Sequence, residues 1–255
     1  MKLLTGFWMA WGNFLALPCP CKKWDNDMKN TMLGFLPLTG LIIGAVWAGL
    51  CVLFVMLGLP YLVISFLVTF SLFALYGFIH LDGFMDCCDA IMSRRPVEEK
   101  QKILKDSHCG AFAVISLAFM LLAYYAFIST ALSFGIDFVD LCMIPVISRG
   151  VAGLNVLLQK PIGHSQYAQG KGSSDSAQKK RASAAILIQL LIFCGIGLFF
   201  AADFVSSAVV ALSVAVVSYL AVLYAKRQLG GMSGDIAGFA IVWGEMAGTL
   251  AMTLI

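Results

Sequence analysis

Chemically active side chains crowd into one decapeptide, HLDGFMDCCD (80–89). A helix would carry Asp82, Asp86 and Asp89 on one face, because they stand at positions i, i+4 and i+7. Like charges in one stripe repel, and a divalent cation removes that repulsion. Hard oxygen donors suit Mg²⁺, which keeps several waters and shares itself with substrate phosphates. The spacing therefore predicts a magnesium site. A solvated helix start, where acids favour the helix dipole, would explain Asp82 but not the whole stripe with His80.

A second acidic motif, GGMSGD (230–235), precedes the last apolar stretch. Its glycines let backbone amides approach an anion at a helix start, and Asp235 would face the first aspartates across one mouth of the protein. Glu245 lies deeper and needs a proton, a metal or Arg149 as its partner. Ionisable residues inside a span are costly and are candidates for function, which applies to Arg149 beside Ser148.

Two further polar segments fall on the same side. Asp106-Ser107-His108 closes the connector before the third apolar stretch, and the glycine-containing segment 163–172 includes Lys171. That segment could approach a phosphate or be a plain linker. Carboxylates, glycine-rich turns and basic residues on one side favour phosphoryl transfer involving a membrane-associated molecule. The chain has no GxxxxGK[ST] and no GxSxG motif, which argues against a P-loop nucleotide hydrolase and against a serine hydrolase of the nucleophile-elbow type.

The composition is that of an integral membrane protein. Of 255 residues, 60% are hydrophobic and 12% are charged, and the mean hydropathy is +0.90. The net charge of +3 is too small to indicate nucleic acid. Apolar stretches near the roughly 20 residues needed for a crossing predict one all-α catalytic domain, 1–255, with about seven transmembrane helices. These stretches are 32–58, 61–79, 110–133, 138–158, 183–202, 205–225 and 236–255.

The N-terminal apolar run, 3–17, is short and carries Trp8, Trp11 and Asn13. We expect a re-entrant or interfacial segment, with a signal peptide as the alternative. The eight cysteines show no zinc-finger spacing, and we interpret most of them as small hydrophobic residues.

Basic residues predict the orientation. Connectors 18–31, 80–109, 159–182 and 226–235 hold 15 of the 17 Lys and Arg residues, and the connectors on the opposite side hold none. The positive-inside rule places the first set in the cytoplasm, so the active site should face the cytoplasm from the bacterial inner membrane.

Motifs spread along the chain resemble one enzyme family. They are LPCP (17–20), FLPLTGLIIG (35–44), HLDGFMDCCDA (80–90), KDSHCGAFA (105–113), SRG (148–150) and GGMSGDIAGFAIVWGE (230–245). This set resembles the cobalamin synthase family, adenosylcobinamide-GDP ribazoletransferase. The resemblance implies that adenosylcobinamide-GDP is joined to α-ribazole or its 5′-phosphate, that GMP is released, and that Mg²⁺ is used. Implied partners are these substrates, membrane lipid, and a homo-oligomer or a complex with other nucleotide-loop assembly enzymes.

Carried over residue by residue, the resemblance and the arrangement of charges assign three groups. The catalytic group is His80, Asp82, Asp106 and Glu245; the metal group is Asp82, Asp86, Asp89 and Asp235; the substrate-binding group is Ser107, Arg149, Lys171 and Gly234. His80 is the first candidate for general base and Asp106 the second, while orienting a carboxylate is the alternative role of His80. Glu245 is expected to support the site by pairing with Arg149 or holding a water.

Departures from the family pattern concern the substrate phosphates. His108 stands where arginine is common, and YAQGKGSS (167–174) replaces a Tyr-Ala-Arg-Glu pattern.

Two other functions stay open as alternatives. A CDP-alcohol phosphotransferase needs Ala-Arg where this chain has Asp86-Cys87, and a cation transporter should place acids mid-span in several helices, where here only Glu245 is deep.

Overall fold

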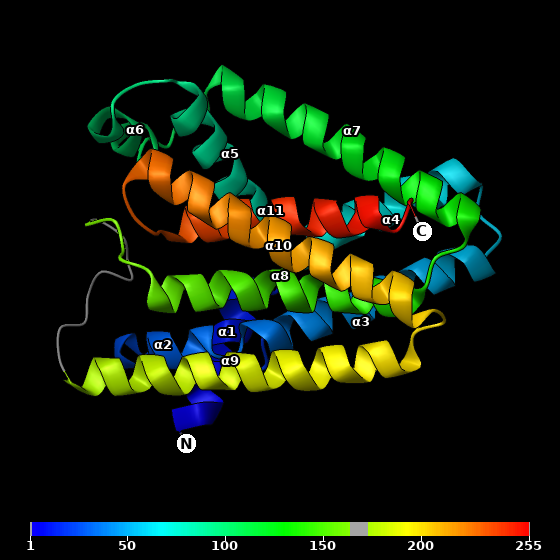
Figure 1. Cartoon of the computed structure of the whole chain (residues 1–255), viewed down its shortest axis with the longest axis horizontal. Helices are drawn as coiled ribbons and strands as arrows, with labels where there is room; N and C mark the ends of the chain where they lie inside the picture. Colours follow the sequence, from blue (N-terminus) through cyan, green and yellow to red (C-terminus); the bar gives the residue numbers. More distant parts are fainter. Residues whose placement is uncertain (1, 164–172, 255) are drawn as a thin grey trace.

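The computed structural model describes residues 2–163 and 173–254, and within those ranges the chain forms helices and no strand (Figure 1). The predicted all-α membrane architecture is confirmed. The helices are α1 (Lys2–Phe14), a 3₁₀ turn (Asn26–Met28), α2 (Lys29–Leu33), α3 (Leu36–Met56), α4 (Tyr61–Leu75), α5 (Ile79–Met92), α6 (Val97–Ile103), α7 (Ala111–Phe134), α8 (Phe138–Leu158), α9 (Ser173–Phe200), α10 (Phe204–Leu229) and α11 (Gly234–Ala251).

Five helices in the described ranges are long and apolar enough to cross a membrane: α3, α7, α8, α9 and α10. The bent pair α4 and α5 would raise the number to six if it is one broken span. The seventh expected stretch is α11, which is not among these helices and whose 18 residues include two acids and four glycines. The predicted count of seven crossings is therefore not confirmed, although each expected stretch does coincide with a helix.

Helices α8 and α11 form the centre of the bundle. In α8, 78% of the span is buried, compared with 11% in the peripheral α9. Glycines bring neighbours close to this centre. A Cβ on Gly40 of α3 would lie 2.3 Å from the Pro145 carbonyl oxygen of α8, and one on Gly244 of α11 would lie 1.8 Å from Ser218 Oγ of α10. Small residues at such contacts allow close helix packing inside membranes.

A sharp turn separates α4 from α5, so the expected stretch 61–79 is not one straight helix. Gly77 and Phe78 both have positive φ, at 63° and 62°, and the two helices meet at 89°. The left-handed region suits glycine, whereas at Phe78 it costs energy that the surrounding packing must supply. The amide of Ala16 donates to the Leu75 carbonyl at 2.8 Å, which ties the segment after α1 to this turn.

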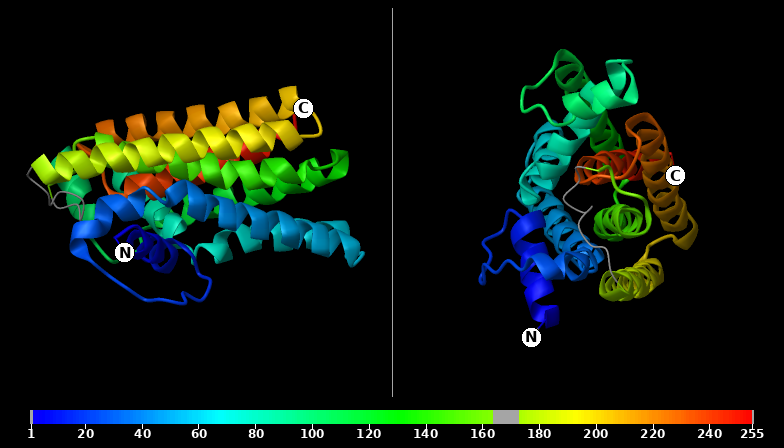
Figure 2. Two further views of the ribbon diagram at one scale, coloured as in Figure 1. Left: turned by 90° about the horizontal axis from the view of Figure 1, so that it is seen from below. Right: turned by 90° about the vertical axis from the view of Figure 1, so that its left-hand side faces the viewer.

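Helix α1 lies across the bundle rather than along it, against α2 and α3 (Figure 2). Its 13 residues extend about 20 Å, too short for a crossing. The basic connectors that the structure describes gather at one end of the bundle, the left-hand end in Figure 1. The C-terminus and the connectors without basic residues lie at the other end.

Candidate active site

The site is built where α5 crosses α11, and glycines make the crossing close. A Cβ on Gly83 would lie 2.9 Å from both the Cα atom and the carbonyl oxygen of Asp235, and one on Gly238 would lie 3.0 Å from the His80 carbonyl oxygen. Each helix thus places a glycine against the other helix's polar residue. This reciprocal contact fixes the distance between the two acidic motifs.

The predicted acidic stripe forms on α5, and Asp235 joins it from α11. Asp82 is exposed, while Asp86, Asp89 and Asp235 are partly buried. The charges of Asp82, Asp235 and Asp89 all act on the carboxyl group of Asp86. Four acids on two elements therefore share one repulsive neighbourhood, as the sequence predicts.

These acids do not form a ready-made metal cage. In residues 2–163 and 173–254, no group of three or more His, Cys, Asp and Glu side chains is arranged to hold an ion. Mg²⁺ does not require such a cage, because one or two carboxylates plus waters and substrate phosphates complete its coordination. The donor set of partly exposed carboxylates fits that mode of binding. Magnesium binding by Asp82, Asp86, Asp89 and Asp235 stays a prediction.

A cavity of about 240 Å³ opens at the crossing, lined by Asp82 and Asp235 together with His80 and Gly234. Asn13 and Phe14 at the end of α1 also line the cavity. The sequence gives no sign of this contribution of Asn13, because the residue lies in a short apolar run far from the acidic motifs. Its amide is a hydrogen-bonding group that can contact whatever occupies the cavity.

His80 lines this cavity from a buried position. Its side chain is 5% exposed and packs between the rings of Phe14 and Tyr76, at centroid distances of 6.3 and 4.7 Å. Nε2 has no hydrogen-bond partner within the described part of the chain. That nitrogen is available to a group bound in the cavity, and the aromatic contacts restrict how the imidazole can turn.

The glycine-rich turn before α11 is braced by a distant segment. Met232 exchanges backbone hydrogen bonds with Lys160 and Ile162, at 2.8 and 2.9 Å, and a Cβ on Gly231 would lie 2.8 Å from the Ile162 amide. The Ser233 hydroxyl then accepts from the Ile236 amide and caps α11. The segment after Ile162 leads toward Lys171, which lies outside the described residues.

The Asp-Ser element lies on the surface loop that leads into α7. Asp106, Ser107 and His108 are all exposed, and His108 Nδ1 lies 2.6 Å from Asp106 Oδ1. Hydrogen bonds from His108 lower the pKa of Asp106, and the hydrogen bond with Asp106 raises the pKa of His108. The loop ends at Gly110, where a Cβ would lie only 2.0 Å from a carboxylate oxygen of Asp89. The loop therefore ends against the last carboxylate of α5.

The predicted pairing of Arg149 with Glu245 is confirmed. Both side chains are 0% exposed, Arg149 Nη1 donates to Glu245 Oε1, and Ser148 Oγ donates to the same oxygen at 3.2 Å. A buried pair removes the charge that either partner would leave alone in a low dielectric. The direct substrate contact expected of Arg149 and a catalytic role of Glu245 are not visible in this arrangement, because neither side chain reaches a surface or lines the cavity.

An aromatic contact links this pair to the cavity. The guanidinium carbon of Arg149 lies 5.3 Å from the Tyr76 ring centroid, and Tyr76 packs on His80. The pair can therefore hold Tyr76, and through it the imidazole that lines the cavity. Tyr76 contacts both the imidazole and the buried pair, and sequence reasoning missed it, since nothing distinguishes it from the other aromatic residues of its apolar stretch.

Comparison with known proteins identifies the family. The cobalamin-5-phosphate synthase family model matches residues 6–253. This chain belongs to that family. A relative named adenosylcobinamide-GDP ribazoletransferase from Clostridium perfringens (strain 13 / Type A) is 34% identical over 97% of this chain and 96% of its own length. Relatives with the same name from Clostridium botulinum (strain Alaska E43 / Type E3) and Geobacillus kaustophilus are each 32% identical, covering 99% and 94% of this chain and 98% and 92% of their own lengths.

No solved structure matches the chain. Membership of the cobalamin-5-phosphate synthase family agrees with the resemblance seen in the sequence motifs. The matched range includes both acidic motifs and the Asp-Ser element, and every site residue named above falls inside it.

Proposed function

We propose that this protein is a transferase of cobalamin synthesis that joins the phosphocobinamide group of adenosylcobinamide-GDP to α-ribazole or its 5′-phosphate, releasing GMP. The product is adenosylcobalamin or its 5′-phosphate. The observation that carries the proposal is the α5–α11 crossing, which sets Asp82 and Asp235 on one cavity in a chain of this family. The relatives' shared name supplies the substrates.

The transfer breaks the phosphoanhydride bond of the GDP-activated corrinoid and forms a phosphodiester bond. The 3′-hydroxyl oxygen of the ribazole bonds to the phosphorus attached to cobinamide, and the bond from that phosphorus to the oxygen of GMP breaks. GMP leaves with the electron pair of the broken bond, and the hydroxyl proton passes to a base. A reaction of this kind depends mostly on positioning and on neutralising charge.

The acidic residues are proposed to hold Mg²⁺. Asp82 and Asp235 line the cavity, and Asp86 and Asp89 continue the stripe toward the loop before α7. When bound, the ion would supply positive charge to the phosphate oxygens of the substrate. The chain's own carboxylates orient that charge, and Gly234 lets the backbone at the start of α11 approach an anionic group.

His80 is the proposed base, because its Nε2 is unpaired among the described residues and its side chain lines the cavity. Replacement by glutamine keeps a hydrogen-bonding side chain that cannot take up a proton. If His80 accepts the proton, His80→Gln and His80→Ala lose kcat to a similar degree, with little change in the KM for α-ribazole. Recovery of kcat in His80→Gln alone would instead assign His80 an orienting role and make Asp106 the candidate base.

We further propose that the protein lies in the bacterial inner membrane with the α5–α11 site open to the cytoplasm. The location of the basic connectors at the same end of the bundle supports this orientation. Both substrates are polar and would reach the site from the cytoplasm.

The experiment follows both products. The purified protein in phospholipid membranes receives adenosylcobinamide-GDP with and without α-ribazole 5′-phosphate, and GMP and corrinoid are quantified by mass spectrometry. The expected result is GMP released in equal amount to a corrinoid that carries the ribazole, and only when ribazole is present. GMP release without an acceptor, or no turnover in folded protein, would refute the proposal.

A further inference from the structure

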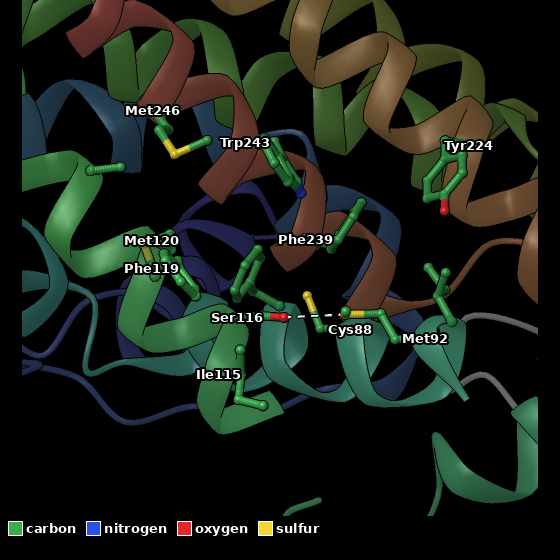
Figure 3. A pocket seen from close by; sticks show the side chains of 13 residues that line it. Cys88, Met92, Ile115, Ser116, Phe119, Met120, Tyr224, Phe239, Trp243 and Met246 are labelled. Atoms are coloured by element: carbon green, nitrogen blue, oxygen red, sulfur yellow. Dashed lines mark hydrogen bonds between the residues drawn. The ribbon is translucent and has the colours of Figure 1, made fainter. Parts of the chain in front are cut away.

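A second, larger cavity opens beside the acidic helix, between α5, α7, α10 and α11 (Figure 3). This apolar crevice has a volume of about 660 Å³. Its α5 wall consists of Phe84, Cys88, Ile91 and Met92, and none of the acids of α5 lines it. The crevice is therefore distinct from the cavity that Asp82 and Asp235 line, and it lies on another side of α5.

The lining excludes a charged occupant. No lining residue carries a formal charge, and aromatic and sulfur side chains supply most of the walls. The buried floor includes the stacked rings of Phe84 and Phe239, 5.8 Å apart, with Met120 beside them. The Ser116 hydroxyl is directed at the Met92 sulfur at 3.4 Å. Methionine sulfur and aromatic faces adapt to a flexible apolar group.

The crevice opens between two helices that qualify as membrane spans, α7 and α10. Its rim residues are exposed: Phe119 by 71%, Tyr224 by 51% and Ile115 by 50%. In a bilayer this rim meets hydrocarbon instead of water. An empty crevice would forfeit dispersion contacts on every wall, and a lipid acyl chain is the apolar group that the surroundings supply.

A basic residue lies on α10 one turn beyond Tyr224, which lines the crevice. Arg227 follows Tyr224 by one turn of α10, at the end of the bundle that carries the basic connectors. Its side chain is exposed, and no hydrogen bond or ion pair involves it in residues 2–163 and 173–254. The neighbouring Lys226 is already bound to Gln159. Arg227 is thus placed to contact a phosphate whose acyl chain passes Tyr224.

We propose that one phospholipid binds here, with an acyl chain in the apolar crevice and its phosphate at Arg227. The chain would run from Met92 and Tyr224 toward Ala123 and Met246, which is from the end of the bundle toward its middle. The lipid then packs on α5 from behind and helps to hold the acidic stripe in place. This site extends beyond the proposed transfer reaction and does not depend on it.

The first experiment fills the crevice. Ala123→Trp places an indole among the lining residues, and Ala118→Trp is the matched control on the exposed side of α7. After purification in detergent, the wild type and Ala118→Trp should retain a stoichiometric phospholipid, and Ala123→Trp should lack it. Delipidated wild type should regain thermal stability on addition of phosphatidylglycerol, whereas Ala123→Trp should not respond. Equal lipid retention, or an equal response, in all these proteins would overturn the proposal.

The second experiment tests the phosphate contact with a variant that leaves the crevice intact. Arg227→Gln should raise the phosphatidylglycerol concentration for half-maximal stabilisation by about fivefold, the contribution of one basic residue near an anionic membrane surface. An unchanged concentration would overturn the assignment of Arg227.

Two other outcomes for Ala123→Trp would replace the lipid by another occupant. Loss of a dimer would indicate that a second copy of the chain fills the crevice. A raised KM for α-ribazole would indicate that the acceptor substrate fills it.

Discussion

The Asp106–His108 pair makes the charge of one surface loop sensitive to pH. The hydrogen bond with Asp106 raises the pKa of His108, so the imidazole keeps its positive charge to a higher pH than a free histidine. The charge is present below that pKa and is lost as pH rises through it. His108 stands where the family commonly has arginine, whose charge does not titrate in this range.

We propose that the charge of His108 contacts a phosphate of adenosylcobinamide-GDP, and therefore expect the KM for this substrate to rise with pH in the wild type and to stay flat in His108→Arg. Steady-state kinetics between about pH 6 and 9 measure this, since an unperturbed histidine titrates near 6.5. Asp106→Asn is the control: it removes the cause of the raised pKa, so the rise in KM should begin at lower pH. Identical pH profiles for wild type and His108→Arg would contradict a phosphate contact by His108.

Single residues were predictable from the sequence where charge or spacing made them unusual. The acidic stripe on α5 follows from helical spacing, and the Arg149–Glu245 pair follows from the cost of a lone charge inside a span. Asn13 and Tyr76 carry no such signal. Their places beside the cavity and the buried pair arise from the way α1 and the turn after α4 pack, which local sequence does not encode.

The α5–α11 crossing is the element on which the geometry of the site depends. At Gly83 an added Cβ would lie 2.9 Å from the Asp235 backbone, so Gly83→Ala must push the two helices apart. A displacement of about 1 Å in positioning groups can cost roughly a hundredfold in rate. We expect Gly83→Ala to lose kcat on that scale, measured by GMP release.

Gly49→Ala in α3 is the matched control, because its Cβ would meet nothing within 4 Å. Alanine is the better helix former, so this variant should be more stable by about 0.5–1 kcal/mol with unchanged kcat. Thermal unfolding in the same membranes measures the stability of both variants. Full activity in Gly83→Ala would show that the crossing tolerates a wider separation than the proposed site allows.

Hydrophobic runs predicted the long helices but not the bends between them. The stretch 61–79 reads as one span, yet Gly77 and Phe78 turn the chain by 89° before α5. The connector 80–109 contains α5 and α6, whose mixed polarity hides them from a search for apolar runs. These differences reflect tertiary packing, because the turn is held by the Ala16–Leu75 hydrogen bond from the segment after α1.

The whole molecule is polarised, with the basic connectors at one end and the connectors without Lys or Arg at the other (Figure 1). The positive-inside rule then predicts that 80–109, 159–182 and 226–235 face the cytoplasm. Cys109 is exposed in the first of these connectors and can report its side directly. Ala202→Cys provides a matched reporter in the exposed α9–α10 connector at the opposite end.

In variants whose remaining cysteines are serine, a membrane-impermeant maleimide should label Ala202→Cys in intact cells. It should label Cys109 only after the cells are permeabilised. Labelling of Cys109 from outside intact cells would reverse the orientation and would move the candidate site away from its expected substrates.

The central claim is that the carboxylates of α5 and α11 carry a magnesium-dependent, GMP-releasing transfer. The most direct test is kcat for GMP release over a titration of Mg²⁺ in wild type, Asp82→Asn and Asp235→Asn, with Glu98→Gln on the exposed α6 as the matched control. We predict Mg²⁺-dependent turnover in wild type and Glu98→Gln, and a loss of more than about tenfold in both aspartate variants, at least roughly 1.4 kcal/mol of barrier. Folding of each variant is checked by its thermal unfolding. An aspartate variant that folds and keeps more than about a tenth of the wild-type kcat, or wild-type turnover without a divalent ion, would contradict the account.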